Sequence, residues 1–300
     1  MEKLPALREQ LTQQGYDVIY LDFTDGATPI QSNAMTLVEL LDYINNPTNR
    51  APGATETIVT AAGMGGQVAR FALAWMEQQN LCYNAKLFVS IDSPHRGSNI
   101  PLGLQYMIDR LHNALLGGPE FDIERDKLLR PAAQQMLIYH FSPGAASLRS
   151  QWQAWEATPG SYPSMLRKVA MANGARLGQA LPGAFPGMEL LKSTGRLAWG
   201  DNFANSLPGA GSRGHDNVIF RYRKPFGYFR SWHYTQVNSS YPTYDQAPGG
   251  TRTTTADAER ESKVLGSYAL RSGSDYQTFI AIISALDIAA AGLIYSANLY

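Results

Sequence analysis

The stretch TIVTAAGMGGQVARFAL at residues 57–73 decides the fold of this chain. Its first part, Thr57–Ala61, is a short β-branched and apolar run of the kind found in buried parallel strands. Met64–Gln79 starts directly behind it and places apolar side chains on one helical face, at Val68, Phe71, Ala72, Trp75 and Met76. The stretch therefore predicts a strand that turns sharply at Gly63 into a helix.

Helix and strand patterns alternate on both sides of this unit. Helices are expected at Leu4–Gln14 and Asn33–Ile44, and strands at Asp17–Phe23, Lys86–Ile91 and Arg167–Ala172. Alternating elements of this kind give right-handed crossovers and a mostly parallel sheet with helices on both faces. We therefore expect an α/β fold in which the Asp17–Phe23 strand pairs directly with Thr57–Ala61.

The later part of the chain changes character. Residues 101–165 are helical but irregular and predict a helical cap region, whereas residues 175–274 are rich in Pro, Gly, Ser, Tyr and Arg. That composition predicts a large, irregular, β-rich insertion with exposed antiparallel strands at Val218–Tyr222 and Tyr234–Val237. A core-like apolar run returns at Phe279–Ile288. Residues 1–300 are accordingly interpreted as one α/β domain.

The composition limits the function. The chain has 300 residues, 44% of them hydrophobic, and can bury a sizeable core. The 25 Lys and Arg balance the 25 Asp and Glu, so no excess charge attracts nucleic acid or an anionic membrane. No apolar run approaches the roughly 18 residues of a membrane span, and no signal peptide is recognisable. The chain as written is therefore expected in the cytoplasm.

Metal, thiol and phosphate chemistry find little support in the sequence. The single cysteine, Cys82, lies between polar stretches without a base beside it and is interpreted as structural. His215 and Asp216 are adjacent, so on a strand they would point to opposite faces, and no further ligands accompany them. The segment 245–250 predicts a turn, because no helix follows its glycines. We expect no metal and no cofactor.

The turn at Gly63 resembles a known catalytic motif. Ala61–Gly65 has the spacing of the G-x-S-x-G nucleophile elbow, in which small residues such as Ala61 and Gly65 let the strand pack against the helix. The continuation through Gly66 is similar to the lipase pattern S-M-G-G-x-x-A-R-x-A-L. Gly63 stands where this pattern has its serine.

A second motif agrees with the first. Ser90–Ser98, SIDSPHRGS, resembles the [TS]-P-H-x-G-[ST] segment that follows the next strand in many lipases. It contains Ser93, which lacks a tight elbow of its own, and His95, which is interpreted as a structural residue of the loop. The chain thus resembles α/β-hydrolases of the lipase and esterase kind from Leu4 to about Leu104. Members of this superfamily are often secreted.

The resemblance also implies an oxyanion site. The backbone N–H of Met64 would be one of its two donors. The other donor comes, in this superfamily, from a loop after an earlier strand, and no such strand precedes Leu4 in this sequence. The sheet is therefore expected to lack its first strands.

The acid and the base are harder to assign by resemblance. Phe279–Asp287 is similar to the segment that follows the acidic residue in lipases, which implies Asp275 as the acid, with Asp245 and Asp287 as the next candidates. The family places its histidine after the acid, but no histidine follows His233, which is the fallback base. With Asp275 as the acid, the base would lie beyond Tyr300.

These observations favour an impaired or inactive carboxylic-ester hydrolase. Loss of the nucleophile costs a serine hydrolase on the order of a million-fold in kcat, and Gly63 is accompanied by the loss of the first oxyanion loop and the final histidine. The alternative is a non-catalytic ligand-binding or interaction protein on the same fold. A hydrolase that uses His233 on an unusual substrate is a third hypothesis. A small ester or acyl ligand is the expected partner.

An aromatic and basic run at 220–232, FRYRKPFGYFRSW, leaves two interpretations open. Alternating aromatic and cationic side chains can stack on nucleic acid bases or on a sugar ring. We favour a half-exposed hairpin at the rim of a substrate cleft.

Overall fold

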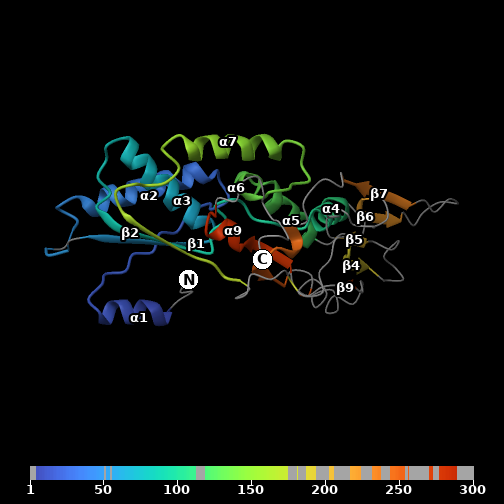
Figure 1. Ribbon diagram of the computed structural model, residues 1–300, viewed down its shortest axis with the longest axis horizontal. Coiled ribbons are helices and arrows are strands. Elements are labelled where there is room, and N and C mark those ends of the chain that lie inside the picture. Colours follow the sequence, from blue (N-terminus) through green and yellow to red (C-terminus); the bar gives the residue numbers. More distant parts are fainter. Residues whose placement is uncertain are drawn as a thin grey trace.

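The computed structural model describes residues 5–50, 52–54, 56–112, 119–174, 181, 187–193, 203–205, 217–223, 232–237, 244–253, 256, 270–272 and 277–288. Their strands form a parallel sheet, a two-stranded ribbon and a five-stranded antiparallel sheet, which follow one another along the molecule (Figure 1). No helix in these residues is long and apolar enough to cross a membrane.

The parallel sheet has three strands, in the order β1 (Thr57–Ala62), β2 (Ala85–Ile91) and β3 (Arg167–Met171). Ala62 pairs with Ile91, and Ile91 pairs with Met171. The carboxyl ends of all three strands therefore lie side by side. The strands predicted around residues 57, 86 and 167 are confirmed, and with them the α/β class of this part.

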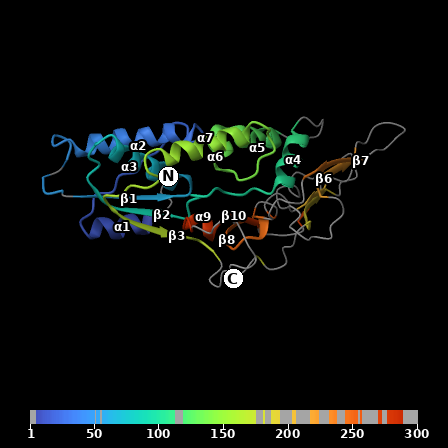
Figure 2. The same ribbon diagram turned by 45° about the horizontal axis from the view of Figure 1, so that its top comes forward.

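Helices pack mainly on one face of this sheet. α2 (Ile30–Asn45) and α3 (Met64–Gln78) cover that face, whereas α1 (Pro5–Gln13) lies on the other side (Figures 1 and 2). Leu7 of α1 is exposed, and every side chain of β3 except the half-buried Val169 is exposed. Helices are thus present on both sides, but only one face of the sheet is well buried.

The strand expected at Asp17–Phe23 is not formed. The segment is irregular and has no strand partner, so it does not pair with β1. Its two aspartates disfavour a strand, and the side chain of Asp22 accepts the N–H of Phe23, a group that a sheet ladder would use (3.0 Å). Ile19 and Tyr20 are exposed, and the segment contributes only Leu21 and Phe23 to the core.

The main core lies between the sheet and the helices. α3 supplies buried apolar side chains on almost every side, because it is enclosed by β1, β2, α2 and the later helices. Those later helices include α6 (Pro131–Met136) and α7 (Ala145–Ala157), which follow α5 (Pro119–Leu129). Trp152 of α7 is fully buried and lies 5.6 Å from Phe71 between ring centroids. Part of the helical region 101–165 therefore belongs to the core of the α/β unit.

The five-stranded antiparallel sheet forms the far end of the molecule. Its order is β7 (Trp232–Gln236), β6 (Val218–Arg223), β5 (Phe203–Asn205), β4 (Glu189–Ser193) and β9 (Leu270–Ser272). The two predicted strands, now β6 and β7, do pair antiparallel. They are not both exposed, however: Ile219 and Phe220 are fully buried. Leu104 and Met107 of α4 (Leu102–Leu111) pack in the same cluster as Phe220, which explains its burial.

A two-stranded antiparallel ribbon lies between the two sheets (Figures 1 and 2). It consists of β8 (Gly249–Arg252), which follows a short helical turn at Tyr244–Gln246, and β10 (Gln277–Ala281), which leads into α9 (Ile282–Ala285). The N–H of Asn99, in the loop after β2, donates to the carbonyl of Phe279 (2.7 Å). The ribbon is thereby fixed beyond the carboxyl ends of the parallel strands.

Candidate functional site

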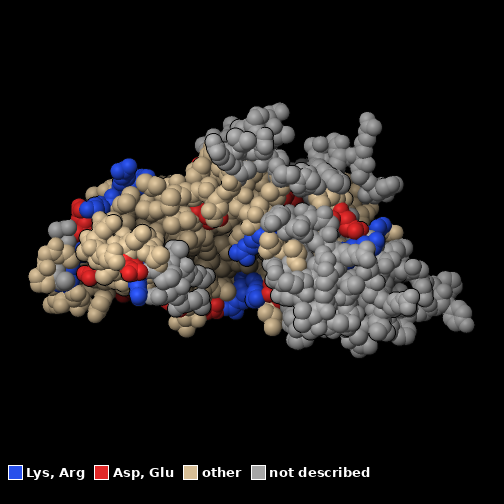
Figure 3. Space-filling model, turned by 90° about the horizontal axis from the view of Figure 1, so that it is seen from below, with Lys and Arg blue, Asp and Glu red and all other residues tan. Residues whose placement is uncertain are grey.

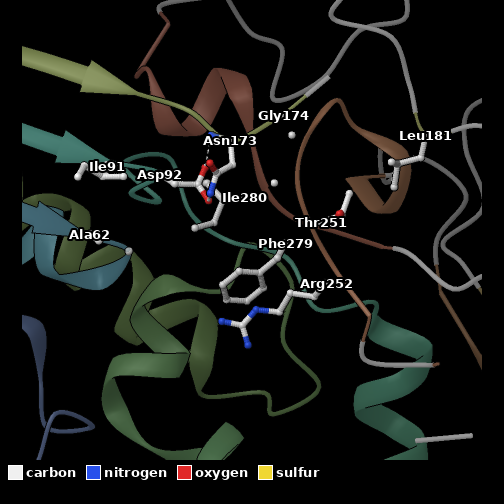
Figure 4. Close-up of a pocket in the computed structure, with 13 residues that line it drawn as sticks. Ala62, Ile91, Asp92, Asn173, Gly174, Leu181, Thr251, Arg252, Phe279 and Ile280 are labelled. Atoms are coloured by element: carbon white, nitrogen blue, oxygen red, sulfur yellow. Dashed lines mark hydrogen bonds between the residues drawn. The ribbon is translucent and has the colours of Figure 1, made fainter. Parts of the chain in front are cut away.

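A cavity of about 610 Å³ opens beyond the carboxyl ends of β1, β2 and β3. One wall is formed by the residues that follow these strands, Gly63, Asp92 and Asn173. The opposite wall comes from the β8–β10 ribbon, including Arg252 and Phe279 (Figure 4). Parallel sheets bind ligands at this edge, and the volume suits a small organic molecule.

Gly63 has the strained backbone of a sharp strand-to-helix turn. Its φ is +56° and its ψ is −132°, a conformation that L side chains rarely adopt. Its N–H donates to the carbonyl of Ile91 (3.0 Å), which holds the turn against β2. A Cβ at Gly63 would meet no atom within 4 Å. The position is therefore open to a side chain, and the sequence provides none.

The strand-to-helix turn is closely packed, and its tightest contact is at Gly66 and not at Gly65. A Cβ on Gly65 would lie 3.6 Å from the Cβ of Ala61, an ordinary contact. A Cβ on Gly66 would overlap the Oγ of Ser93 and lie 2.5 Å from its Cβ. Gly66, more than Gly65, therefore permits the approach of α3 to the loop after β2.

Met64 begins α3, and no side chain caps that helix. The first N–H groups of any helix have no partner within it. Among the first three N–H groups of α3, only that of Gly66 has a backbone acceptor, the carbonyl of Gly63 (3.1 Å). The N–H of Met64 remains a candidate donor beside the cavity, as the resemblance implies.

His95 and Ser93 are buried and do not line the cavity. The Nε2 of His95 lies 2.8 Å from the Oγ of Ser90. Burial, helped by the nearby positive charge of Arg70, lowers the pKa of His95 to about 4. His95 is therefore neutral at pH 7 and closely packed within the loop.

The candidates for acid and fallback base are dispersed. Asp275 lies outside the described residues. His233 belongs to β7 of the five-stranded sheet, where its backbone pairs with Tyr222, and its side chain is not among those described. Asp245 is buried and accepts the Nδ2 of Asn99 (2.7 Å). Of the candidates whose side chains the structure describes, Asp245 does not line the cavity with Gly63.

Asp287 belongs instead to a partly buried charge cluster. It accepts the Nε of Arg96 (2.8 Å) and the hydroxyl of Tyr162 (2.9 Å), and it lies 3.4 Å from the Nη1 of Arg70. Arg70 also pairs with Glu156 (3.2 Å), and its guanidinium carbon lies 3.7 Å from the centre of the Tyr162 ring. The cluster joins α3 and α7 to the chain behind α9, and none of these side chains lines the cavity.

Asp92 is the cavity acid that the sequence did not reveal. It directly follows β2, next to Gly63 after β1, and it has a left-handed φ of +46°, rare for a residue with a side chain. Its carboxylate accepts the backbone N–H of Asn173 (3.0 Å) and the Nδ2 of the same residue (3.3 Å), as Figure 4 shows. Burial raises the pKa of Asp92 despite these bonds. A polar residue directly after a buried strand is the signal that could have identified it.

Arg252 faces the cavity from β8. Its guanidinium carbon lies 4.0 Å from the centre of the Phe279 ring (Figure 4). The sequence did not single out this residue, because stacking across an antiparallel ribbon leaves no local pattern.

The chemistry open to this cavity is limited. Among the described residues that line it, there is no Ser, Cys or His. Asp92 and Arg252 are its charged groups. The described part of the chain holds no group of three or more His, Cys, Asp or Glu side chains that could bind a metal ion.

Comparisons of the chain with protein-family models, curated proteins and solved structures give no match. The site is therefore interpreted from its own geometry.

Proposed function

We propose that this protein is a catalytically inactive relative of the carboxylic-ester hydrolases that binds a small acyl or ester ligand in the cavity behind β1–β3. The observation that carries the proposal is the open, strained Gly63 at the cavity wall. It has the backbone of a nucleophile elbow but no nucleophile.

The physical argument against turnover concerns more than one side chain. Acyl transfer needs a nucleophile, a base within hydrogen-bond reach and donors for the oxyanion. Asp92 is the carboxylic acid that lines the cavity together with Gly63, and its carboxylate accepts two hydrogen bonds from Asn173. His95 is buried elsewhere with Ser90. A serine at Gly63 would therefore find no described histidine to accept its proton.

The argument for binding rests on the shape and the lining of the cavity. Phe279 and Ile280 offer apolar surface from β10, while Asp92, Asn173 and Arg252 offer a few polar groups. A mostly apolar cavity with a small number of polar anchors is typical of small-molecule sites. A ligand with an apolar acyl chain and a polar carboxyl group matches this combination of apolar surface and polar anchors.

Turnover is tested with two variants at the elbow. Gly63→Ser adds a hydroxyl, and Gly63→Ala is the matched control, because it introduces the same backbone strain without a hydroxyl. We expect both to hydrolyse p-nitrophenyl butyrate at the background rate. A gain of several orders of magnitude in Gly63→Ser alone would refute inactivity and favour a hydrolase disabled at one residue.

Binding is tested by calorimetric titration with hexanoate and methyl hexanoate. Thr251→Trp places a large ring on a lining residue of β8, and Thr253→Trp makes the same change just outside the lining. We expect Thr251→Trp to abolish binding and Thr253→Trp to retain it. The proposal fails if neither compound binds the wild-type protein, or if both variants bind alike.

A further inference from the structure

The guanidinium of Arg252 is held in place without being neutralised. It stacks on Phe279 at 4.0 Å, and no described carboxylate forms an ion pair with it. Stacking uses the face of the guanidinium and leaves the N–H groups at its edge available. Because the side chain of Arg252 is already ordered by this stacking, it loses less conformational entropy when a ligand binds.

The other charged group of the cavity is Asp92, whose carboxylate reaches β8 at Gly250, two residues before Arg252. Asp92 is fixed there by Asn173 and has no described cation beside it. An anionic group would be repelled by Asp92 and attracted to Arg252. The guanidinium of Arg252 therefore offers the favourable position for the charge of an anionic ligand.

The hollow in the face shown in Figure 3 has Lys or Arg side chains beside it. Asp or Glu side chains lie near the same hollow, and the protein as a whole is neutral, with 25 basic and 25 acidic residues. An anion is therefore attracted by Arg252 itself and not by an excess of positive charge.

Resting on the proposed function, we infer that the ligand is a free carboxylic acid, bound through its carboxylate by Arg252, and that the neutral ester of the same acid binds much more weakly. The planar N–H fork of arginine matches the two oxygens of a carboxylate. The acyl chain lies against the apolar lining residue Phe279, which contacts Arg252. The inferred ligand is thus the carboxylic acid that hydrolysis of an ester would release.

The experiment compares hexanoate with methyl hexanoate on three proteins by calorimetric titration. These are the wild-type protein, Arg252→Gln and the control Arg167→Gln. Arg167 is an exposed arginine at the start of β3, roughly 20 Å along the strand direction from Asn173. Both arginines are exposed, so neither substitution should prevent folding.

We expect wild-type protein to bind hexanoate about 10- to 100-fold more tightly than methyl hexanoate. Arg252→Gln should bind hexanoate no more tightly than methyl hexanoate, and Arg167→Gln should retain the preference for hexanoate. Equal affinity of wild-type protein for acid and ester overturns the inference, and so does a preference that survives in Arg252→Gln. Absence of binding for both compounds refutes the proposed function itself.

Discussion

The close approach of α3 to the loop after β2 makes Gly66 the most restrictive residue of the elbow. In Gly66→Ala, the new Cβ would lie 2.5 Å from the Cβ of Ser93, about 1 Å closer than an ordinary carbon contact. Rotating the Ser93 hydroxyl cannot relieve this contact, because the Cβ is attached to the backbone and Ser93 is fully buried. Overpacking of this kind costs about 3 kcal/mol, and the better helix propensity of alanine offsets about 1 kcal/mol. We therefore expect a net loss of about 2 kcal/mol.

Urea unfolding of three variants measures this effect. Gly65→Ala is the matched control, since its Cβ would make only an ordinary contact at 3.6 Å with Ala61, and it should be as stable as the wild-type protein or slightly more stable. Adding Ser93→Gly to Gly66→Ala removes the obstructing atoms and should restore part of the loss, with a coupling energy of about 1 kcal/mol. If Gly66→Ala is as stable as Gly65→Ala, the packing described for this elbow is wrong.

Three further predictions concern the elbow and the buried titratable groups. Gly63→Ala meets no atom but must adopt a φ of +56°, so it should lose about 1–3 kcal/mol in the same assay, and an unchanged unfolding midpoint would contradict the strain. Burial raises the pKa of Glu156 from 4.5 to about 7, so folding favours its protonated form. Relative to Glu156→Gln, the wild-type protein should therefore lose about 3 kcal/mol of unfolding free energy as the pH rises from 4.5 to 7. A difference in unfolding free energy between the two proteins that stays constant with pH would refute this. Burial lowers the pKa of His95 from 6.5 to about 4, so the folded protein binds a proton at this imidazole more weakly than the unfolded chain does. Relative to His95→Gln, the wild-type protein should therefore lose about 3 kcal/mol of unfolding free energy as the pH falls from 6.5 to 4. Parallel curves of unfolding free energy against pH for the two proteins would argue against this.

The sequence was sufficient for the strand–turn–helix unit around Gly63. The residues before Gly63 have the pattern of a strand and those after it have the periodicity of a helix. Elements with such a clear local pattern can be predicted from the sequence. The segment Asp17–Phe23 shows the limit of that reasoning. Its apolar residues resemble a strand, but an aspartate side chain takes a backbone N–H and two large side chains remain exposed.

The candidate site was only partly predictable. The position and strain of Gly63 follow from a local motif, whereas the other wall of the cavity comes from β8 and β10, far along the chain. The place of Asp92 directly after a strand is visible in the sequence, but its contact with Asn173 depends on the pairing of β2 with β3. The burial of Phe220 likewise depends on its packing against α4, and the sequence pattern of β6 does not predict that contact.

The ion pair between Arg96 and Asp287 has a consequence for how the protein is made. The two residues are 191 positions apart, and the hydroxyl of Ser284 also accepts the backbone N–H of Arg96. A ribosome adds about 5–20 residues per second, so the loop behind β2 emerges roughly 10–40 s before its partners. During that interval Arg70 and Arg96 are both without the carboxylate they share. Arg96 must therefore stay hydrated during that interval, whereas Arg70 can pair earlier with Glu156, and the contacts of Arg96 with Ser284 and Asp287 form only late in translation.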